Sequence, residues 1–432
     1  MTSLSSPVTL KPPSQDDFYN YPKGLEDAKL GDILKVRTAT SQLASPFGLL
    51  NIKNTWQVML RSEDSFGNAT AIVSMEPFDA DPNKVISYQA YKDSVNQDCA
   101  PSYGFLSRSS VQTIGLHSDM LYVTLALREG YYVISADYEG RQAAFSAGIL
   151  ASRGTLNTIR AAMQSGNFSG INPDAKVAMW GYSGGTHASG FAAVLQPKYA
   201  PELKKNLIAV AEAADGTFSA AFVPTSLVGL TNEYAYARDT FLSYANQSRL
   251  EEVTQISDYC VAVDALRFFG RYILTGPNPL FPSGYALFRD PTLSPIIEEN
   301  SLVYLNESYV PEIPVFIYHG RIDQIVPWKD SRKTYDHWCA AGISSLESTI
   351  SGHLSVLLKG LPAAWKWLSD RFDARINNIF YPNISQSALD FVGSIYQTLK
   401  DIDLGSASDS QLANNASIAA LHKILSTIED AL

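Results

Sequence analysis

The chain alternates between short apolar runs and amphipathic stretches, which polar turns separate. Apolar runs typical of strands lie at 56–60, 69–75, 85–90, 130–140, 176–180, 207–211 and 314–323. Stretches with helical character lie at 144–164, 183–194 and 330–341, and another begins near residue 353. Strands that alternate with helices at this spacing predict a largely parallel sheet with helices on both faces. The expected fold is therefore of the α/β class.

One long segment interrupts this rhythm. Residues 215–313 separate two expected core strands and are rich in aromatic side chains. A segment of this length between core strands is best explained as an inserted cap. We therefore expect an N-terminal arm and the first part of the core in 1–214, the cap in 215–313 and the second part of the core in 314–400.

The last residues, 401–432, are expected to form a separate tail. GSASDS at 405–410 predicts a hinge, and the apolar residues beyond it recur mostly at intervals of three and four. This spacing predicts an amphipathic helix. Docking of its apolar face against the protein body is the preferred interpretation, and a membrane role is the alternative.

Composition and charge narrow the function classes. Hydrophobic residues make up 46% and charged residues 18% of the 432 positions, which is typical of a packed globular protein. The formal net charge is -10 and no basic run occurs, so the chain is a poor candidate for a nucleic-acid-binding protein. No apolar run reaches the roughly 18 residues of a transmembrane helix. A neutral or apolar substrate remains compatible with this composition.

Glycosylation sequons favour a secreted, extracellular protein. Six N-x-S/T sequons occur, at Asn68, Asn167, Asn246, Asn306, Asn383 and Asn415. The N-terminus is polar and Pro-rich and lacks the apolar core of a signal peptide. We interpret the chain as a secreted glycoprotein whose signal peptide has been replaced by Met1. The alternative is an intracellular protein with incidental sequons.

The cysteine content allows one disulfide. Cys99, Cys260 and Cys339 are the three cysteines, so an oxidised chain would hold one bridge and one free thiol. Spacing alone does not choose the pair. No cluster of Cys and His has the spacing of metal ligands, so no metal site is expected.

The stretch KVAMWGYSGG at 176–185 carries the strongest chemical motif. Gly181, Ser183 and Gly185 fit G-x-S-x-G, with Tyr182 inside the motif. A nucleophile between a strand and a helix sits on a strained turn where bulky neighbours would collide. The helix that follows directs its N-terminal N–H groups at a developing oxyanion. The flanking apolar strand and helical stretch favour a nucleophile elbow over an incidental turn serine.

A serine nucleophile needs a histidine base, and placement favours His353. His187 lies one turn into the helix behind the elbow, and His319 lies in an apolar strand, where a core or supporting role is expected. His337 falls within a helix and His422 in the tail helix. His353 follows Ser351-Gly352 in an expected loop, where a base can be both mobile and directed.

The base needs an acid, and Asp323 is the preferred residue. It follows the strand PVFIYHG, at the carboxyl end where open α/β sheets gather their active sites. Asp330 is the alternative, but it is expected to begin the next helix as its N-cap. The chain order Ser183, Asp323, His353 is the order that α/β-hydrolases use.

Several separated motifs carry a family resemblance. WGYSGG, HGRIDQIVP, SGHLSV, SYQAYKDSVNQDCAPSYG and DYEG together resemble the yeast secretory lipases of the Candida antarctica lipase A type. DDFYNYPKGLEDAKLGDILKVR is also similar to lipases of Candida yeasts, and the similarity extends from about residue 15 to about 375. The resemblance implies an α/β-hydrolase fold with a helical cap (lid), a buried acyl-chain tunnel and no cofactor.

The resemblance also implies residue roles. It assigns the same three residues as nucleophile, acid and base, and adds an oxyanion hole from Gly184 and Asp93. An aspartate is unusual there, so either its backbone N–H or a protonated side chain would act as the donor. The resemblance pairs Cys99 with Cys260. This chain differs from the family pattern at Cys339, which has no later cysteine to pair with, and at the C-terminal helix.

The resulting prediction is a secreted serine lipase or esterase that acts on lipid esters through an acyl-enzyme on Ser183. Triacylglycerols and fatty-acid esters, met at a lipid–water interface, are the expected substrates. The first alternative is an acyltransferase, in which an alcohol outcompetes water as the acyl acceptor. A further alternative is a non-catalytic lipid-binding protein of the same fold, which the intact order of the three residues disfavours.

Overall fold

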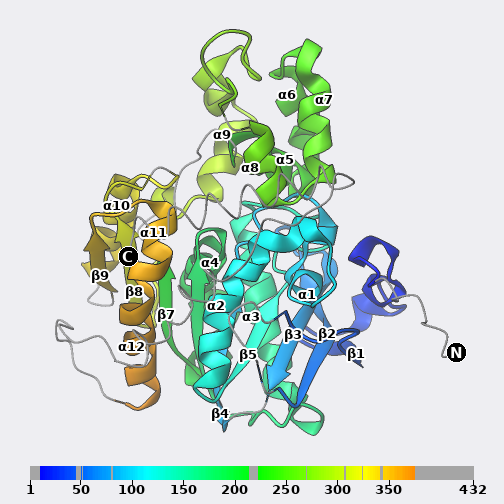
Figure 1. Cartoon of the computed structure of the whole chain (residues 1–432), viewed down its shortest axis with the longest axis vertical. Coiled ribbons are helices and arrows are strands. Elements are labelled where there is room, and N and C mark those ends of the chain that lie inside the picture. The colour runs from blue at the N-terminus through cyan, green and yellow to red at the C-terminus, as the bar shows by residue number, and fades with distance from the viewer. Residues whose placement is uncertain are drawn as a thin grey trace, which may run out of the picture.

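A nine-stranded sheet forms the centre of the molecule (Figure 1), with strand order β1-β2-β3-β5-β4-β6-β7-β8-β9. The computed structural model describes residues 10–44, 50, 52–78, 81–213, 222–268, 270–305, 308–323, 325–340 and 344–374. The strands are β1 (Ile33–Thr38), β2 (Asn54–Glu63), β3 (Ala69–Phe78), β4 (Asp81–Gln89), β5 (Tyr131–Ala136), β6 (Lys176–Tyr182), β7 (Leu207–Ala213), β8 (Val315–Gly320) and β9 (Ser344–Thr349).

The sheet has an antiparallel edge and a parallel remainder. Strands β1, β2 and β3 pair antiparallel, and β3 pairs antiparallel with β5. From β5 through β4, β6, β7 and β8 to β9, every pairing is parallel. The parallel strands all end at one edge, which is where α/β proteins place their chemistry. The predicted α/β class is confirmed.

Helices cover both faces of the parallel strands. They are α1 (Pro101–Gly104), α2 (Ile114–Arg128), α3 (Gly148–Gln164), α4 (Gly184–Tyr199), α10 (Trp328–Cys339), α11 (His353–Lys359) and α12 (Leu361–Phe372). On β6, Ala178 and Trp180 pack with residues of α2 and α12, whereas Val177 and Met179 pack with residues of α3 and α4. Alternate residues of a strand point to opposite faces, so a run that is apolar throughout indicates a strand buried on both sides.

The sequence prediction missed two strands and misplaced some helix ends. Strand β1 lies just beyond the expected N-terminal arm, and β9 is a polar run, SSLEST. Helix α10 begins at Trp328, so the expectation that Asp330 would be its N-cap is wrong. His353 is the first residue of α11 and does not lie in the expected loop. Edge strands can carry polar side chains on a solvent face, which removes the apolar signal.

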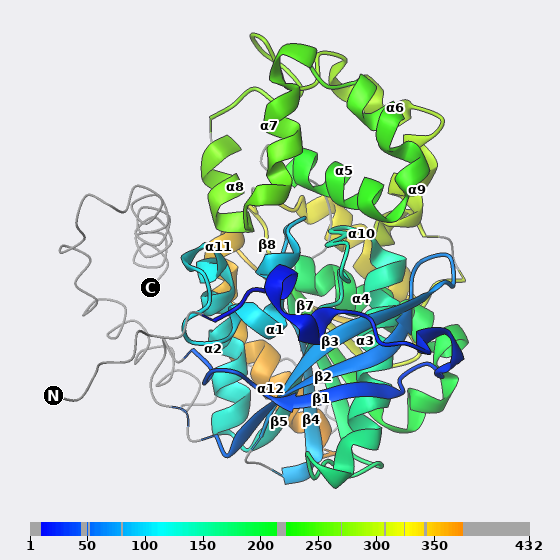
Figure 2. The same cartoon turned by 90° about the vertical axis from the view of Figure 1, so that its right-hand side faces the viewer.

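The described residues between β7 and β8 form a helical layer without strands. It contains α5 (Phe222–Glu233), α6 (Arg238–Ser243), α7 (Leu250–Thr254), α8 (Val261–Phe268) and α9 (Leu293–Glu299). Figures 1 and 2 show this layer beyond the carboxyl ends of the parallel strands. Its own apolar cluster includes Phe241, Phe268 and Phe281. The aromatic side chains of this cluster therefore serve packing.

A disulfide joins this helical layer to the core. Cys99 and Cys260 are bonded, with their Cα atoms 5.7 Å apart, as the family resemblance implied. Cys260 directly precedes α8, and Cys99 lies in the loop that follows β4. The bridge therefore holds the base of the helical layer near the loop that contains Asp93. Cys339 is a free, exposed thiol.

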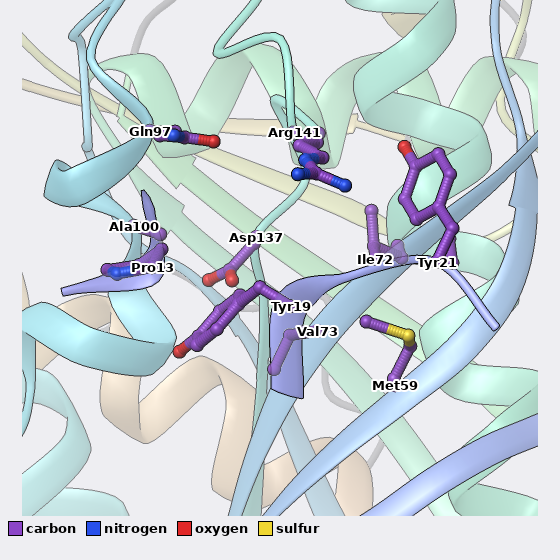
Figure 3. Close-up of a pocket in the computed structure, with 12 residues that line it drawn as sticks. Pro13, Tyr19, Tyr21, Met59, Ile72, Val73, Gln97, Ala100, Asp137 and Arg141 are labelled. Atoms are coloured by element: carbon purple, nitrogen blue, oxygen red, sulfur yellow. The ribbon is translucent and has the colours of Figure 1, made fainter. Parts of the chain in front are cut away.

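The N-terminal arm is held on the sheet by a polar network. The Tyr19 hydroxyl lies 2.8 Å from Ser102 Oγ, and Ser102 donates from its backbone N–H and its hydroxyl to Asp137 at 2.8 and 2.6 Å. The small pocket in Figure 3 lies between this arm and β2, β3 and the end of β5. Asp137 therefore ties α1 and the arm to the end of β5.

None of the described helices is long and apolar enough to span a membrane. The expected tail at 401–432, with its predicted hinge and amphipathic helix, lies outside the described residues. Those predictions therefore stay predictions.

Candidate active site

Five polar residues lie just beyond the carboxyl ends of parallel strands. Asp93 follows β4, Glu139 follows β5, Ser183 follows β6, Asp323 follows β8 and His353 follows β9. Because these strands are neighbours or near neighbours in the sheet, their ends converge beneath the helical layer. Sheet topology thus gathers residues that are far apart in the sequence.

Ser183 lies on a strained turn between β6 and α4. Its backbone adopts φ 52° and ψ -124°, an unfavourable region for a residue with a side chain. The flanking glycines permit this turn, because a Cβ at Gly185 would lie 1.8 Å from the Gln89 carbonyl oxygen, and one at Gly181 would lie 2.3 Å from the Gly185 carbonyl oxygen. The strained strand-to-helix turn that the motif predicted is present, and the role of Ser183 as nucleophile stays a prediction.

His353 connects Ser183 to Asp323. Its Nε2 lies 2.9 Å from Ser183 Oγ, and its Nδ1 lies 2.8 Å from Asp323 Oδ2. The Tyr182 hydroxyl donates a short hydrogen bond to the His353 carbonyl oxygen, which fixes the start of α11 beside the elbow. The imidazole is nearly buried, whereas Ser183 is half-buried. The three side chains form one hydrogen-bonded chain, and Asp330 takes no part in it.

Asp323 is held as a carboxylate. Its Oδ1 accepts hydrogen bonds from the backbone N–H groups of Ile325 and Val326, both at 2.8 Å. Burial raises the pKa of this carboxyl, but hydrogen bonds from His319 and His353, the charge of His353 and the Val326 N–H outweigh burial and hold the pKa well below its usual value. An ionised acid next to the imidazole is therefore the stable state.

His319 is a second histidine beside the acid. Its side chain is fully buried, and its Nε2 lies 3.2 Å from the Val326 carbonyl oxygen and 3.5 Å from Asp323 Oδ2. Its Nδ1 has no hydrogen-bond partner, so the proton belongs on Nε2, where it faces both oxygens. The sequence indicated a supporting role for His319, and the signal was a polar residue inside an apolar strand.

Asp93 lies against Gly184, the residue that follows Ser183. Asp93 is buried, with φ 45°, and a Cβ at Gly184 would lie 1.7 Å from Asp93 Oδ1. Burial and the nearby Glu139 carboxylate raise the pKa of Asp93 well above its usual value, and the Gly184 N–H lowers it less. The neutral form of the Asp93 carboxyl is therefore favoured relative to an ordinary aspartate, and the carboxyl contacts the first residue of α4.

The sequence prediction missed the ion pair beside Asp93. Lys92 Nζ lies 2.9 Å from Glu139 Oε2, and both side chains are only 2% exposed. Burial raises the pKa of Glu139 and outweighs the Lys92 ammonium and the backbone N–H of Asp93, which lower it. The available signal was a charge in each of the motifs YKDS and DYEG, at the end of an apolar strand.

The remaining candidate residues lie outside this chain of contacts. His187 Nε2 lies 2.9 Å from the Asn300 carbonyl oxygen, so His187 connects α4 to the end of α9. His337 is half-buried on α10, and His422 lies outside the described residues.

The six predicted glycosylation sites differ in their surroundings. Asn68 and Asn167 are exposed, although the Asn68 amide donates to Asp64 Oδ2 at 2.8 Å. Asn246 is half-buried, and its amide donates to Asn278 Oδ1 at 2.7 Å. Asn306, Asn383 and Asn415 lie outside the described residues. Exposure makes Asn68 and Asn167 the better glycosylation candidates, and modification stays a prediction.

Comparisons with known proteins identify relatives of this chain. A family model described as "Secretory lipase" matches residues 106–378. Lipase 1 of Candida albicans is 44% identical over 93% of this chain and 92% of its own length. Lipase 2 of the same yeast is 42% identical over 94% of this chain and 93% of its own length. These relatives match almost the whole chain.

Solved structures match the fold. Candida antarctica lipase A in its closed state superposes with a TM-score of 0.77 at 25% identity, covering 90% of this chain and 96% of that one. The rice cell wall degrading esterase LipA from Xanthomonas oryzae superposes with a TM-score of 0.59 at 15% identity, over 80% of this chain and 98% of that one. The latter supports the fold alone. Together with the family model and the Candida relatives, these findings show that the chain belongs to the secretory lipase family and has the α/β-hydrolase fold.

Proposed function

We propose that the chain is a secreted serine lipase in which Ser183 attacks the carbonyl carbon of a lipid ester. The observation that carries this proposal is the continuous hydrogen-bonded chain from Ser183 Oγ through His353 to Asp323, with separations of 2.9 and 2.8 Å. Membership of a lipase family supplies the substrate class, esters of fatty acids and triacylglycerols.

In the proposed first step, His353 Nε2 takes the Ser183 proton while Oγ bonds to the ester carbonyl carbon. The imidazolium that forms is stabilised by the ionised Asp323. Collapse of the tetrahedral intermediate breaks the ester C–O bond, and His353 returns the proton to the departing alcohol. Water then repeats the sequence on the acyl-enzyme, which releases the fatty acid and restores Ser183.

The oxyanion of each intermediate is proposed to lie between Gly184 N–H and Asp93. Two groups of Asp93 are candidate donors to the oxyanion, the backbone N–H and the side-chain carboxyl. Their surroundings favour the carboxyl. The Asp93 backbone N–H faces the Glu139 carboxylate, whereas its carboxyl faces Gly184 and has a raised pKa. A neutral carboxylic acid can donate its proton to an oxyanion, which a carboxylate would repel.

The segment 215–313, whose described residues form the helical layer, is proposed to act as a cap over this site. Its position beyond the strand ends and its disulfide to the loop after β4 support this assignment. On this view 1–214 and 314–400 form the two parts of the hydrolase core. Extracellular location is proposed from the family and the exposed sequons at Asn68 and Asn167.

Covalent labelling tests the proposal directly. The wild-type protein and Ser183→Ala are treated with a fluorophosphonate, and adducts are located by peptide mass spectrometry. We expect one adduct on Ser183 of the wild type, none on the variant, and loss of p-nitrophenyl ester hydrolysis in the variant. Hydrolysis that persists in Ser183→Ala, or a wild type without an adduct, would contradict the proposal and favour a non-catalytic lipid-binding protein.

The preferred acyl acceptor, water or an alcohol, is tested by analysing the products of ester turnover. Esters of several chain lengths are incubated with and without methanol, and the acid and methyl ester products are quantified. We expect acid as the main product without methanol. Methyl ester in excess over acid at low methanol would identify the alternative, an acyltransferase that uses the same acyl-enzyme.

A further inference from the structure

The loop that carries Asp93 rests on a buried ion pair. Lys92 Nζ and Glu139 Oε2 are 2.9 Å apart, and each side chain is 2% exposed. The Arg267–Asp264 pair of the helical layer differs, because its arginine is 22% exposed. Burying two charges carries a desolvation cost that their attraction often does not recover, so such a pair is weak evidence for stability by itself. Its position suggests another role.

The pair connects two neighbouring strand ends. Lys92 lies three residues beyond β4, and Glu139 lies three residues beyond β5, which pairs with β4. A second contact joins the same two segments, because the Tyr138 hydroxyl donates to the Ala90 carbonyl oxygen at 2.6 Å. Residues 138–139 therefore hold residues 90–92 at two points, one on the backbone and one on a side chain.

The residue next to these two contacts has a strained backbone. Asp93 has φ 45°, a conformation that a residue with a side chain adopts only when its surroundings impose it. Lys92 directly precedes it, and the Asp93 N–H faces the Glu139 carboxylate. On the far side, the Asp93 carboxyl contacts Gly184. The ion pair therefore holds both the side chain before Asp93 and the amide of Asp93 itself.

The end of β5 is itself fixed. Asp137, two residues before Glu139, accepts two hydrogen bonds from Ser102 at 2.8 and 2.6 Å. The Tyr91 N–H, on the other side of Lys92, donates to Asp119 Oδ2 of α2 at 3.0 Å. Hydrogen bonds thus fix the segments next to the Asp93 loop, and the Lys92–Glu139 pair is the contact beside Asp93 itself.

We propose that the Lys92–Glu139 ion pair is a positioning element that holds the Asp93 carboxyl against Gly184 and thereby shapes the oxyanion site. This inference rests on the proposed function, since it assigns a role only if Ser183 forms a tetrahedral intermediate. Neither residue is placed against the reacting atoms. The pair acts through Asp93, so its loss should weaken binding of the transition state more than binding of the substrate.

The main test replaces both charges at once. Lys92→Met/Glu139→Leu exchanges the pair for apolar side chains of similar size, a change that proteins often tolerate without loss of stability. We expect an unchanged KM for p-nitrophenyl butyrate and a kcat lowered by about 10- to 100-fold, less than the loss of an oxyanion donor itself. The inhibition constant of a trifluoromethyl ketone, which forms a tetrahedral oxyanion on serine, should rise by the same factor.

A matched control uses an ion pair elsewhere in the molecule. Arg153 of α3 and Glu63 of β2 are 3.0 Å apart and 20% and 18% exposed. Arg153→Met/Glu63→Leu should leave kcat and the inhibition constant unchanged. Equal losses in both double variants would overturn the inference, because they would show a general effect of removing an ion pair.

Single substitutions keep the inference testable if the double variant unfolds. Glu139→Gln retains an oxygen that can face Lys92 and the Asp93 N–H, whereas Glu139→Leu does not. We expect Glu139→Gln to keep at least a roughly fivefold higher kcat than Glu139→Leu at matched thermal stability, the value of about one hydrogen bond. Equal kcat values in these two variants, or wild-type kinetics in a folded double variant, would overturn the inference.

Fluorophosphonate labelling separates this test from that of the proposed function. We expect complete labelling of Ser183 at long times in the wild type and in the double variant, with a slower rate in the variant. A wild type that is not labelled would contradict the proposed function. Labelling at equal rates in both proteins would overturn only the role of the ion pair.

Discussion

Two aspartates with buried side chains lie near Ser183, and their pKa values are shifted in opposite directions. Asp323 lies on the side of His353, and its pKa is held well below the usual value. Asp93 lies on the side of Gly184, and its pKa is raised well above that value. Burial raises the pKa in both cases, so burial alone does not explain the difference.

The partners of each carboxyl decide the outcome. Asp323 accepts hydrogen bonds from two backbone N–H groups and from His353 Nδ1, all at 2.8 Å. His319 Nε2 lies farther away, 3.5 Å from Asp323 Oδ2. Asp93 faces the Gly184 N–H and the negative Glu139 instead. The same residue type is therefore shifted toward the anion in one surrounding and toward the neutral acid in the other. This is a general way in which one site holds two acids in different roles.

The largest loss of activity should come from replacing Asp323, the aspartate with the lowered pKa, by a neutral residue. We predict that Asp323→Asn lowers kcat by about 10⁴-fold, because a neutral amide does not hold His353 in the required tautomer or stabilise the imidazolium. Asp330→Asn, on the adjacent helix, is the control and should retain wild-type kcat. Steady-state hydrolysis of p-nitrophenyl butyrate measures both. A loss below tenfold in Asp323→Asn would remove the proposed difference between the two aspartates.

The effect of replacing Asp93, the aspartate with the raised pKa, should depend on whether the new side chain can donate a hydrogen bond. We predict that Asp93→Gly, which retains the backbone N–H and tolerates φ 45°, loses about 10²- to 10³-fold in kcat/KM, whereas Asp93→Asn stays within about tenfold of the wild type because its amide still donates. Thermal unfolding of both variants controls for folding. Near-normal turnover in Asp93→Gly would assign the donor to the backbone N–H.

The raised pKa of Asp93 also predicts a pH dependence. The proposed donor proton is kept to a higher pH than in an ordinary aspartate and is lost as pH rises through the raised pKa. Wild-type kcat should therefore fall as pH rises through that pKa, and Asp93→Asn, which does not ionise, should lack this fall. The comparison uses kcat over the pH range in which both proteins stay folded, at substrate concentrations well above KM.

A smaller effect is expected from the second histidine on Asp323. We predict that His319→Phe lowers kcat/KM by about 3- to 10-fold, the value of one hydrogen bond. His319→Gln, whose amide can reach the position of Nε2, should lose less. Kinetics and thermal unfolding are measured for both. Equal losses in the two variants would show that His319 acts through packing alone.

The smallest effect on catalysis is expected from a third buried aspartate, which lies away from the site and should affect stability alone. Burial raises the pKa of Asp264 to about 7, although Arg267 lies 2.9 Å away. Between about pH 4 and about pH 7 the folded state therefore retains a proton that the unfolded state has lost, so this group's contribution to stability decreases as pH rises. We predict that Asp264→Asn removes up to about 4 kcal/mol of this decrease and leaves kcat unchanged. The free energy of unfolding at several pH values measures the difference, and parallel curves for wild type and variant would contradict it.

Much of the site was predictable from local sequence. G-x-S-x-G between an apolar run and a helical stretch requires close backbone approach at Gly181 and Gly185, and the structure has both contacts. Asp323 and His353 follow in the expected order because strand ends collect functional residues. Strand β9 was missed because its polar sequence has no apolar pattern, and this strand places His353 beside β8.

The sequence by itself determined the α/β class, the elbow and the three residues that meet there, because strand periodicity, glycine requirements and chain order are local properties. Tertiary structure alone decided the direction in which the pKa of each acid is shifted. Asp93 and Asp323 are equivalent as residues, and their pKa values diverge because folding buries Asp93 beside Glu139 and gives Asp323 two histidines and backbone N–H donors. Electrostatic surroundings depend on residues far apart in the chain, and periodicity carries no information about them.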